Sequence, residues 1–249
     1  MERQARWTDR YVVGWHDSDF RGKVHPASVC RFLMETAGNH AGHLQFGYQE
    51  AVQRKEIWVI VQLIVKLNTW PAYTDEILIE TWPMGAEGFY AFREFRILDA
   101  GRKEAGAASS RWMVINAETR RPQPMEIIRH SMHLIIPEPA LPERTTRIPA
   151  PSEPLIRTIH RVAYSEIDLS GHVNNARYVE WGLNAIPLEW HRDYQLRLFQ
   201  VNYLSEVLYG DTIGIVHDQD HRLLEGIRES DGKSVFKMMM EWKKDESLQ

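Results

Sequence analysis

The chain has 249 residues, 43% hydrophobic and 26% charged, with a formal charge of −4 at pH 7. This composition is typical of a globular protein, and the acidic excess argues against a chain whose main partner is nucleic acid. A single cysteine, Cys30, excludes an intrachain disulfide and a metal site built from cysteines alone. No run approaches the ~18 apolar residues of a membrane helix, and the N-terminal stretch lacks the apolar core of a signal peptide. We therefore expect a cytoplasmic protein.

The first half predicts a strand, a long helix and four further strands. Residues 10–14 read as a strand and 16–26 as a polar loop. A helix comes next, because Val29, Phe32, Leu33 and Thr36 share one face at helical spacing. Strand-like runs cover 57–67, 76–82, 89–98 and 105–116, and a glycine turn at 99–103 joins the last two.

A proline-rich bridge separates this half from the next. Residues 136–154 hold six prolines and show no apolar periodicity. Proline fixes φ and removes a backbone donor, so this stretch joins neither a helix nor a central strand. We expect an N-terminal domain at 1–135, a linker at 136–155 and a C-terminal domain at 156–249.

The second half repeats the order of elements. It predicts a strand at 156–164, a polar loop, a helix at 175–186 stopped by Pro187, and strands at 197–203, 212–219, 222–229 and 233–243. One helix followed by antiparallel strands, made twice, predicts an α+β protein. Each half would be a long helix wrapped by a curled antiparallel sheet.

The repeat extends to individual residues. DFRGKVHPA (19–27) matches DLSGHVNNA (168–176) at a constant spacing of 149 positions, and PAYTDEILIE (71–80) resembles VLYGDTIGIV (207–216). At the position of Lys23 in the first copy, the second copy has His172. Only the second copy therefore offers a group that exchanges a proton near neutral pH. We interpret the chain as a duplicated unit whose second copy carries the chemistry.

His172 lies four residues after Asp168 and precedes the second predicted helix. A carboxylate at that distance can hydrogen-bond the imidazole and fix its tautomer. The backbone amides of Val173 and Asn174 could stabilise an oxyanion, because the first N–H groups of a helix lack intrahelical partners. Equally, an asparagine before a helix is an ordinary cap, and many loop histidines are structural. The residues alone leave both interpretations open.

Two other candidates come from the pattern. Glu206 ends a predicted strand, where a surface glutamate is the common case. His40 and His43, three residues apart on the first helix, could bind a metal, but no third ligand has suitable spacing, which favours core packing.

The stretch IDLSGHVNNARYVEW (167–181) resembles the signature of the acyl-acyl carrier protein thioesterases, in which an aspartate, an asparagine and a histidine precede VNN and a helix. FLMETAGNHA (32–41), WVIVQLIVKLNTWPAYTDEILIETWP (58–83) and RWMVINAETRRPQP (111–124) resemble segments of this family in the same order. The resemblance covers almost the whole chain. It implies two fused hotdog folds, each a long helix wrapped by an antiparallel sheet.

The resemblance also implies site residues. Asp168 and His172 match the aspartate and histidine of the signature, and Glu206 matches a glutamate on a strand after the helix. Ser170 stands where many members have asparagine, and Val207 where plant members have a cysteine once proposed as nucleophile. A cysteine nucleophile at that position is thus excluded.

The expected reaction is hydrolysis of a fatty acyl thioester of acyl carrier protein, which releases the fatty acid and terminates fatty acid synthesis. Ser170, Val173 and Asn174 are expected to position the substrate or its oxyanion. Val29, Phe32, Leu33 and Thr36 are expected to line the acyl-chain pocket.

Two other functions remain open from the sequence: an acyl-coenzyme A thioesterase and a non-catalytic acyl-binding or sensor module. No metal or organic cofactor is expected, and either a monomer or a homodimer is consistent with two fused hotdogs.

Overall fold

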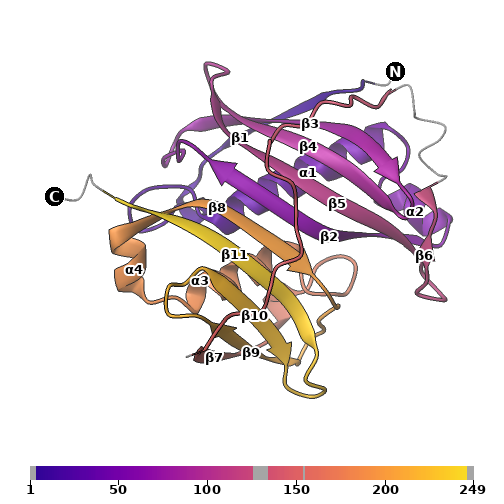
Figure 1. The fold of residues 1–249 in the computed structure, drawn as a ribbon. Helices are drawn as coiled ribbons and strands as arrows, with labels where there is room; N and C mark the ends of the chain where they lie inside the picture. Colours follow the sequence, from indigo (N-terminus) through magenta and orange to yellow (C-terminus); the bar gives the residue numbers. More distant parts are fainter. Residues whose placement is uncertain (1–3, 126–133, 154, 246–249) are drawn as a thin grey trace. The chain divides into compact units, whose positions relative to one another are not determined.

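The computed structural model describes residues 4–125, 134–153 and 155–245 (Figure 1). The chain divides into two compact units, Met1–Thr145 and Thr146–Gln249, which we call unit 1 and unit 2. The division falls inside the predicted linker, whose own limits stay a prediction.

Unit 1 is an antiparallel sheet with a long helix packed on one face. Its strands are β1 (Trp7–Val12), β2 (Glu56–Leu67), β3 (Glu76–Glu87), β4 (Tyr90–Asp99), β5 (Glu104–Asn116) and β6 (Pro122–Gln123), and its helices are α1 (Pro26–His43) and α2 (Tyr48–Gln53). The strands lie in the order β1-β3-β4-β5-β2, and β6 pairs with β5. Helix α1 packs on β1 and β3.

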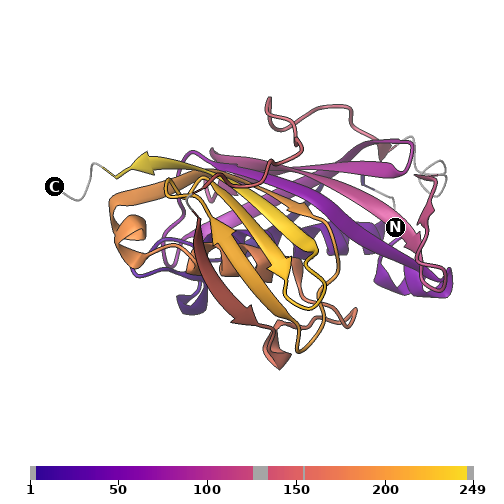
Figure 2. The ribbon, with the colours of Figure 1, turned by 60° about the horizontal axis from the view of Figure 1, so that its bottom comes forward.

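Strand β4 shows how the two faces of this sheet differ. Successive side chains on a strand point to opposite faces. Arg93 reaches α1, where its Nη1 lies 3.0 Å from Nδ1 of the buried His40. Glu94 and Arg96, at alternate positions, therefore share the outer face, away from α1. Figure 2 shows the chain that leads toward unit 2 running over this outer face, with α1 beneath the sheet.

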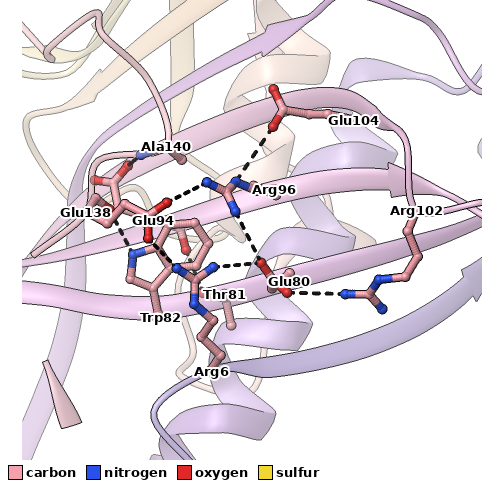
Figure 3. Close-up of polar contacts among 10 residues, drawn as sticks. All are labelled: Arg6, Glu80, Thr81, Trp82, Glu94, Arg96, Arg102, Glu104, Glu138 and Ala140. Carbon is pink, nitrogen blue, oxygen red and sulfur yellow. Dashed lines mark hydrogen bonds and ion pairs between the residues drawn. The ribbon is translucent and has the colours of Figure 1, made fainter. Parts of the chain in front are cut away.

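Residues 134–145, which include the start of the proline-rich bridge, are fastened to that outer face. The carboxylate of Glu138 pairs with Arg6 and Arg96, and its backbone carbonyl accepts from Trp82 Nε1 at 2.9 Å (Figure 3). The Arg6 guanidinium lies 4.2 Å from the centre of the fully buried Trp82 ring. Two residues on, the Ala140 N–H donates to the buried Glu94 carboxylate at 2.9 Å. The first part of the bridge therefore belongs to unit 1 as a packed segment.

Unit 2 repeats the arrangement with a shorter helix. Its strands are β7 (Ile156–Arg161), β8 (Tyr194–Tyr203), β9 (Thr212–His217), β10 (Leu223–Arg228) and β11 (Ser234–Lys244), and its helices are α3 (Asn175–Asn184) and α4 (Leu188–Asp193). The strands lie in the order β8-β11-β10-β9-β7, all antiparallel.

The core of unit 2 lies between α3 and β11. The rings of Tyr178 and Trp181 on α3 lie 5.3 and 6.3 Å from that of Phe236, measured between centroids. Gly182 lets the helix approach the sheet, because a Cβ there would lie only 2.9 Å from Met238 Sδ. This packing fixes the start of α3, where the candidate site lies.

The predicted order of the long helix and the strands is confirmed in both units. The second helix ends earlier than predicted, at Asn184, and Pro187 stands at the N-cap of α4. The six-residue helices α2 and α4 were not predicted. At the described residues, no helix is long and apolar enough to cross a membrane.

Candidate active site

The loop before α3 contains a tight turn that ends at His172. The Asp168 N–H donates to the His172 carbonyl at 2.9 Å, and the Gly171 N–H donates to the Asp168 carbonyl at 3.0 Å. Gly171 has φ +81°, a left-handed conformation that glycine adopts without a Cβ clash. The turn therefore fixes the position of the His172 backbone, from which the imidazole extends.

Asp168 stabilises this turn with one of its two carboxylate oxygens. Its Oδ1 accepts from the Ser170 N–H at 2.9 Å and from the Ser170 hydroxyl at 2.5 Å. The serine thus fixes the orientation of the carboxylate, although it is shorter than the asparagine of the resembled signature.

His172, in the loop before α3, meets Glu206, which lies in the segment after β8 and not at the end of a strand as predicted. The distance from His172 Nε2 to Glu206 Oε2 is 3.4 Å, and the side chains are 25% and 42% exposed. The main chains are joined beside them, since the Val173 N–H donates to the Val207 carbonyl at 3.0 Å. An acid–base pair accessible from outside thus lies next to the Asp168 turn.

The structure corrects the role predicted for two backbone amides. The Val173 N–H is bonded to Val207, and the Asn174 N–H donates to the Glu166 carbonyl at 2.9 Å. Neither amide is available to an oxyanion, because each already has a carbonyl partner within the protein. The Asn174 side chain instead caps α3, accepting from the Ala176 N–H at 3.0 Å.

Tyr178 is a site residue that the sequence pattern did not single out. It lies one turn into α3 and is almost fully buried. Burial raises its pKa far above the ordinary value; a hydrogen bond with the Val207 backbone opposes this, while the charges of Glu206 and Asp168 raise the pKa further. The phenol is therefore neutral and lies near both carboxylates.

The buried carboxylate of Glu166 anchors the loop before α3. Glu166 accepts from the Ala163 N–H at 2.7 Å and from Trp181 Nε1 at 2.6 Å, and lies 3.0 Å from His160 Nε2. Burial raises the pKa of Glu166, but these hydrogen bonds outweigh it and leave the pKa below its ordinary value. Glu166 is therefore ionised at neutral pH and ties the loop to α3.

The first copy has the same loop without the histidine and the glutamate. The Asp19 carboxylate accepts from the Arg21 and Lys23 N–H groups at 2.8 and 2.9 Å, and Gly22 has φ +69°. The Val24 N–H donates to the Pro71 carbonyl, as Val173 does to Val207. By the same correspondence, Lys23 replaces His172 and Trp70 replaces Glu206. Unit 1 therefore serves as an internal reference for unit 2.

The residues proposed to line an acyl pocket lie on α1 in unit 1. Val29, Leu33 and Thr36 are buried, and Phe32 stacks on Tyr11 with 4.6 Å between ring centroids. They form the inner face of α1, as predicted. Their contact with an acyl chain stays a prediction.

Metal binding has no suitable cluster in the described part of the chain. Three or more histidine, cysteine or carboxylate side chains are nowhere placed together to hold an ion within it. His40 packs in the core of unit 1 instead, with both ring nitrogens bonded to protein groups.

Comparison with known proteins decides the family. The model of the acyl-ACP thioesterase N-terminal domain matches residues 4–128, and that of the C-terminal domain matches residues 151–247. The chain belongs to the acyl-ACP thioesterase family, where ACP denotes acyl carrier protein.

Individual members of the family resemble the chain over most of its length. An acyl-ACP thioesterase from Bacteroides thetaiotaomicron has 26% identity and a TM-score of 0.87, with 96% of this chain and 98% of that one covered. The 12:0-ACP thioesterase from Umbellularia californica shares the fold at a TM-score of 0.83 and 17% identity, covering 98% and 100% of the two chains.

Among curated relatives, the chloroplastic oleoyl-acyl carrier protein thioesterase 2 of Arabidopsis thaliana is 25% identical over 230 residues. The match covers 86% of this chain but only 63% of that relative. The predicted α+β fold of two hotdogs, each a helix on an antiparallel sheet, is confirmed by the solved members.

Proposed function

We propose that this acyl-ACP thioesterase family member hydrolyses fatty acyl thioesters of acyl carrier protein to the fatty acid and the free carrier thiol. The observation that carries the proposal is the 3.4 Å pairing of His172 with Glu206 beside the Asp168 turn. By resemblance, Asp168 and His172 match the aspartate and histidine of the family signature, and Glu206 matches the glutamate of the family that follows the helix. Unit 1 shares the loop but has Lys23 and Trp70 at the positions of the acid–base pair.

In the proposed reaction, the Glu206 carboxylate contacts His172 Nε2 at 3.4 Å and orients the ring. The other ring nitrogen donates to the thioester oxygen and stabilises the charge that develops there, in place of the occupied amides of Val173 and Asn174. Asp168 has one oxygen fixed by Ser170, and its Oδ2 acts as the base toward water. The neutral phenol of Tyr178 stays protonated beside the two carboxylates.

The bonds and protons balance without a cofactor. The water oxygen bonds to the acyl carbon and gives a proton to Asp168. The tetrahedral intermediate then collapses and the carbon–sulfur bond breaks. The departing thiolate receives the proton that Asp168 took from water. The products are the fatty acid and the carrier thiol.

A covalent route remains as a variant of the same function. In it, Asp168 attacks the acyl carbon directly, forms a mixed anhydride and is released by water. A single turnover in oxygen-18 water tests for an anhydride that water opens at the Asp168 carbon. Label in the enzyme carboxylate would contradict direct attack by water, whereas label confined to the fatty acid agrees with it.

The test of function is thiol release from a panel of acyl-ACP thioesters of different chain lengths. We expect release by the wild type and a fall of about 10²–10⁴-fold in kcat for His172→Ala and Glu206→Ala, the range typical of a lost acid–base group. Lys23→Ala, the matched change in unit 1, should keep full activity.

Three results would oppose this function. A strong preference for acyl-coenzyme A over acyl-ACP with the same acyl chain would make the coenzyme A thioester the substrate. Acyl binding with no thiol release would favour a binding module. Full activity in His172→Ala would place the reaction elsewhere.

A further inference from the structure

Arg228, the last residue of β10, reaches the main chain at Glu206. Its Nη1 donates to the Glu206 carbonyl at 3.2 Å, and its side chain is 18% exposed. A guanidinium that hydrogen-bonds the backbone carbonyl of a residue restrains the main chain there, and with it the position from which the side chain extends. Arg228 is thus placed to determine the direction in which the Glu206 carboxylate points.

Two carboxylates hold the guanidinium in turn. Arg228 Nε lies 3.1 Å from Asp231 Oδ1, and Nη1 lies 3.6 Å from Asp211 Oδ2. Asp211 also accepts from the Leu208 N–H at 3.0 Å, within the turn that comes after Glu206. The planar fork of arginine suits this multiple contact, which a single ammonium group does not reproduce fully.

The first copy shows that the turn itself does not require the arginine. Asp75, the counterpart of Asp211, accepts from the Ala72 N–H at 2.8 Å just as Asp211 does from Leu208. The counterpart of Arg228 can be found from strand register. Arg228 pairs with Ile213 across the sheet of unit 2. In unit 1, Ile77 matches Ile213 in the repeat and pairs with Asp99. Asp99 is therefore the counterpart of Arg228.

The two copies therefore differ at three coupled positions. Unit 2 has His172, Glu206 and Arg228 where unit 1 has Lys23, Trp70 and Asp99. The arginine occurs in the copy that has the acid–base pair and is replaced by a residue of opposite charge in the copy that lacks it.

We propose that Arg228 is a positioning residue for the proposed thioester hydrolysis, holding Glu206 so that its carboxylate faces His172. The inference rests on the proposed function. Arg228 acts through the Glu206 backbone and does not touch the substrate. The charged and titratable groups near Arg228 are the carboxylates of Asp211 and Asp231 and the phenol of Tyr178.

The test compares Arg228→Met and Arg228→Lys with Arg157→Met. Arg157 belongs to the same sheet and pairs with Glu229. We expect Arg228→Met to lower kcat by about 10–100-fold with KM unchanged, because a displacement of about 1 Å has effects of that order. Arg228→Lys should recover only part of the loss, because one ammonium group replaces the fork, and Arg157→Met should match the wild type.

A second readout does not depend on activity. The imidazole resonances of His172, monitored by NMR at fixed pH, should shift in Arg228→Met and remain in place in Arg157→Met. An arginine that served only global stability would lower the melting temperature without moving these resonances selectively. If Arg228→Met does not fold, Arg228→Gln, a shorter and uncharged donor, replaces it with the same expected loss.

The outcomes separate this inference from the proposed function. Unchanged kcat and unchanged His172 resonances in Arg228→Met would overturn the positioning role, as would an equal loss in Arg157→Met. Absence of thiol release by the wild type would overturn the function, and the NMR comparison would still test the contact.

Discussion

The environment of His40 determines both its tautomer and its charge. Arginine can only donate, so the contact of 3.0 Å from Arg93 Nη1 makes His40 Nδ1 an acceptor. The proton then resides on Nε2, which lies 2.9 Å from the Gln4 carbonyl. Burial, reinforced by the charge of Arg93, lowers the pKa of His40 to about 3. Burial also lowers the pKa of Arg93, to about 10, which leaves it protonated at neutral pH.

This buried pair predicts an acid-sensitive contribution to stability. The unfolded chain protonates His40 near pH 6.5, whereas the folded chain does so only near pH 3. Between these values the unfolded state binds more protons, so the free energy of unfolding falls as the pH falls. The slope from His40 approaches ~1.4 kcal/mol per pH unit.

Urea unfolding at pH 7, 6 and 5 would measure this slope. His40→Gln keeps an acceptor for Arg93 but does not titrate, so its stability should fall less steeply than that of the wild type. Equal slopes for the two proteins would contradict the assignment of a neutral buried His40.

At the same scale, the sequence revealed only part of the candidate site. Asp168 and His172 were found from the duplicated loop, because Lys23 stands opposite His172. Glu206 was selected only through the family resemblance, since a carboxylate at a strand end has no local signal that names its partner. Tyr178 and Arg228 were missed because their contacts join α3 and β10 to the segment after β8, and tertiary packing alone brings those elements together.

Among the elements, the turn before each helix is the most informative. Gly22 and Gly171 have φ values of +69° and +81°, and a Cβ at either would meet open space. The cost of alanine is therefore conformational in both, about 1–2 kcal/mol for a left-handed residue. The two turns are matched in geometry and differ in the next side chain, Lys23 or His172.

This match predicts a separation of stability from activity. Gly22→Ala and Gly171→Ala should lower the free energy of unfolding by similar amounts. Only Gly171→Ala should also lower kcat, because it displaces His172 relative to Glu206. Chemical denaturation and thiol release on both variants would check this, and equal kcat values would show that the His172 turn tolerates the change.

Sequence periodicity predicted the long elements well and the short ones poorly. The strand runs and α1 are long enough for alternation or helical spacing to be visible. Helices α2 and α4 have six residues each, too few to show a period. The rule that helix-start amides are unpartnered also failed at Val173 and Asn174, because the preceding loop and the strand end supply carbonyls that the local sequence does not reveal.

For the whole molecule, duplication predicts that one substitution does not create a second site. Lys23→His would place an imidazole on the unit 1 turn, but Trp70 and Asp99 would still stand at the positions of Glu206 and Arg228. We therefore expect the double variant Lys23→His/His172→Lys to be as inactive as His172→Lys alone.

Thiol release on these two variants and the wild type would settle the point. Restored activity in the double variant would show that a histidine on either turn suffices, which would contradict the roles proposed for Glu206 and Arg228.

The bond from Val173 to Val207, and its counterpart from Val24 to Pro71, is made entirely by main-chain atoms. Its acceptor is a valine carbonyl in one copy and a proline carbonyl in the other, so the identity of the side chain is immaterial to it. The side chains of the loop before the helix and of the segment after the strand can therefore be replaced over evolutionary time while the two segments stay joined. A gene duplicated once would hold two such frameworks, and divergence between them would require amino-acid replacements but no rearrangement of the backbone.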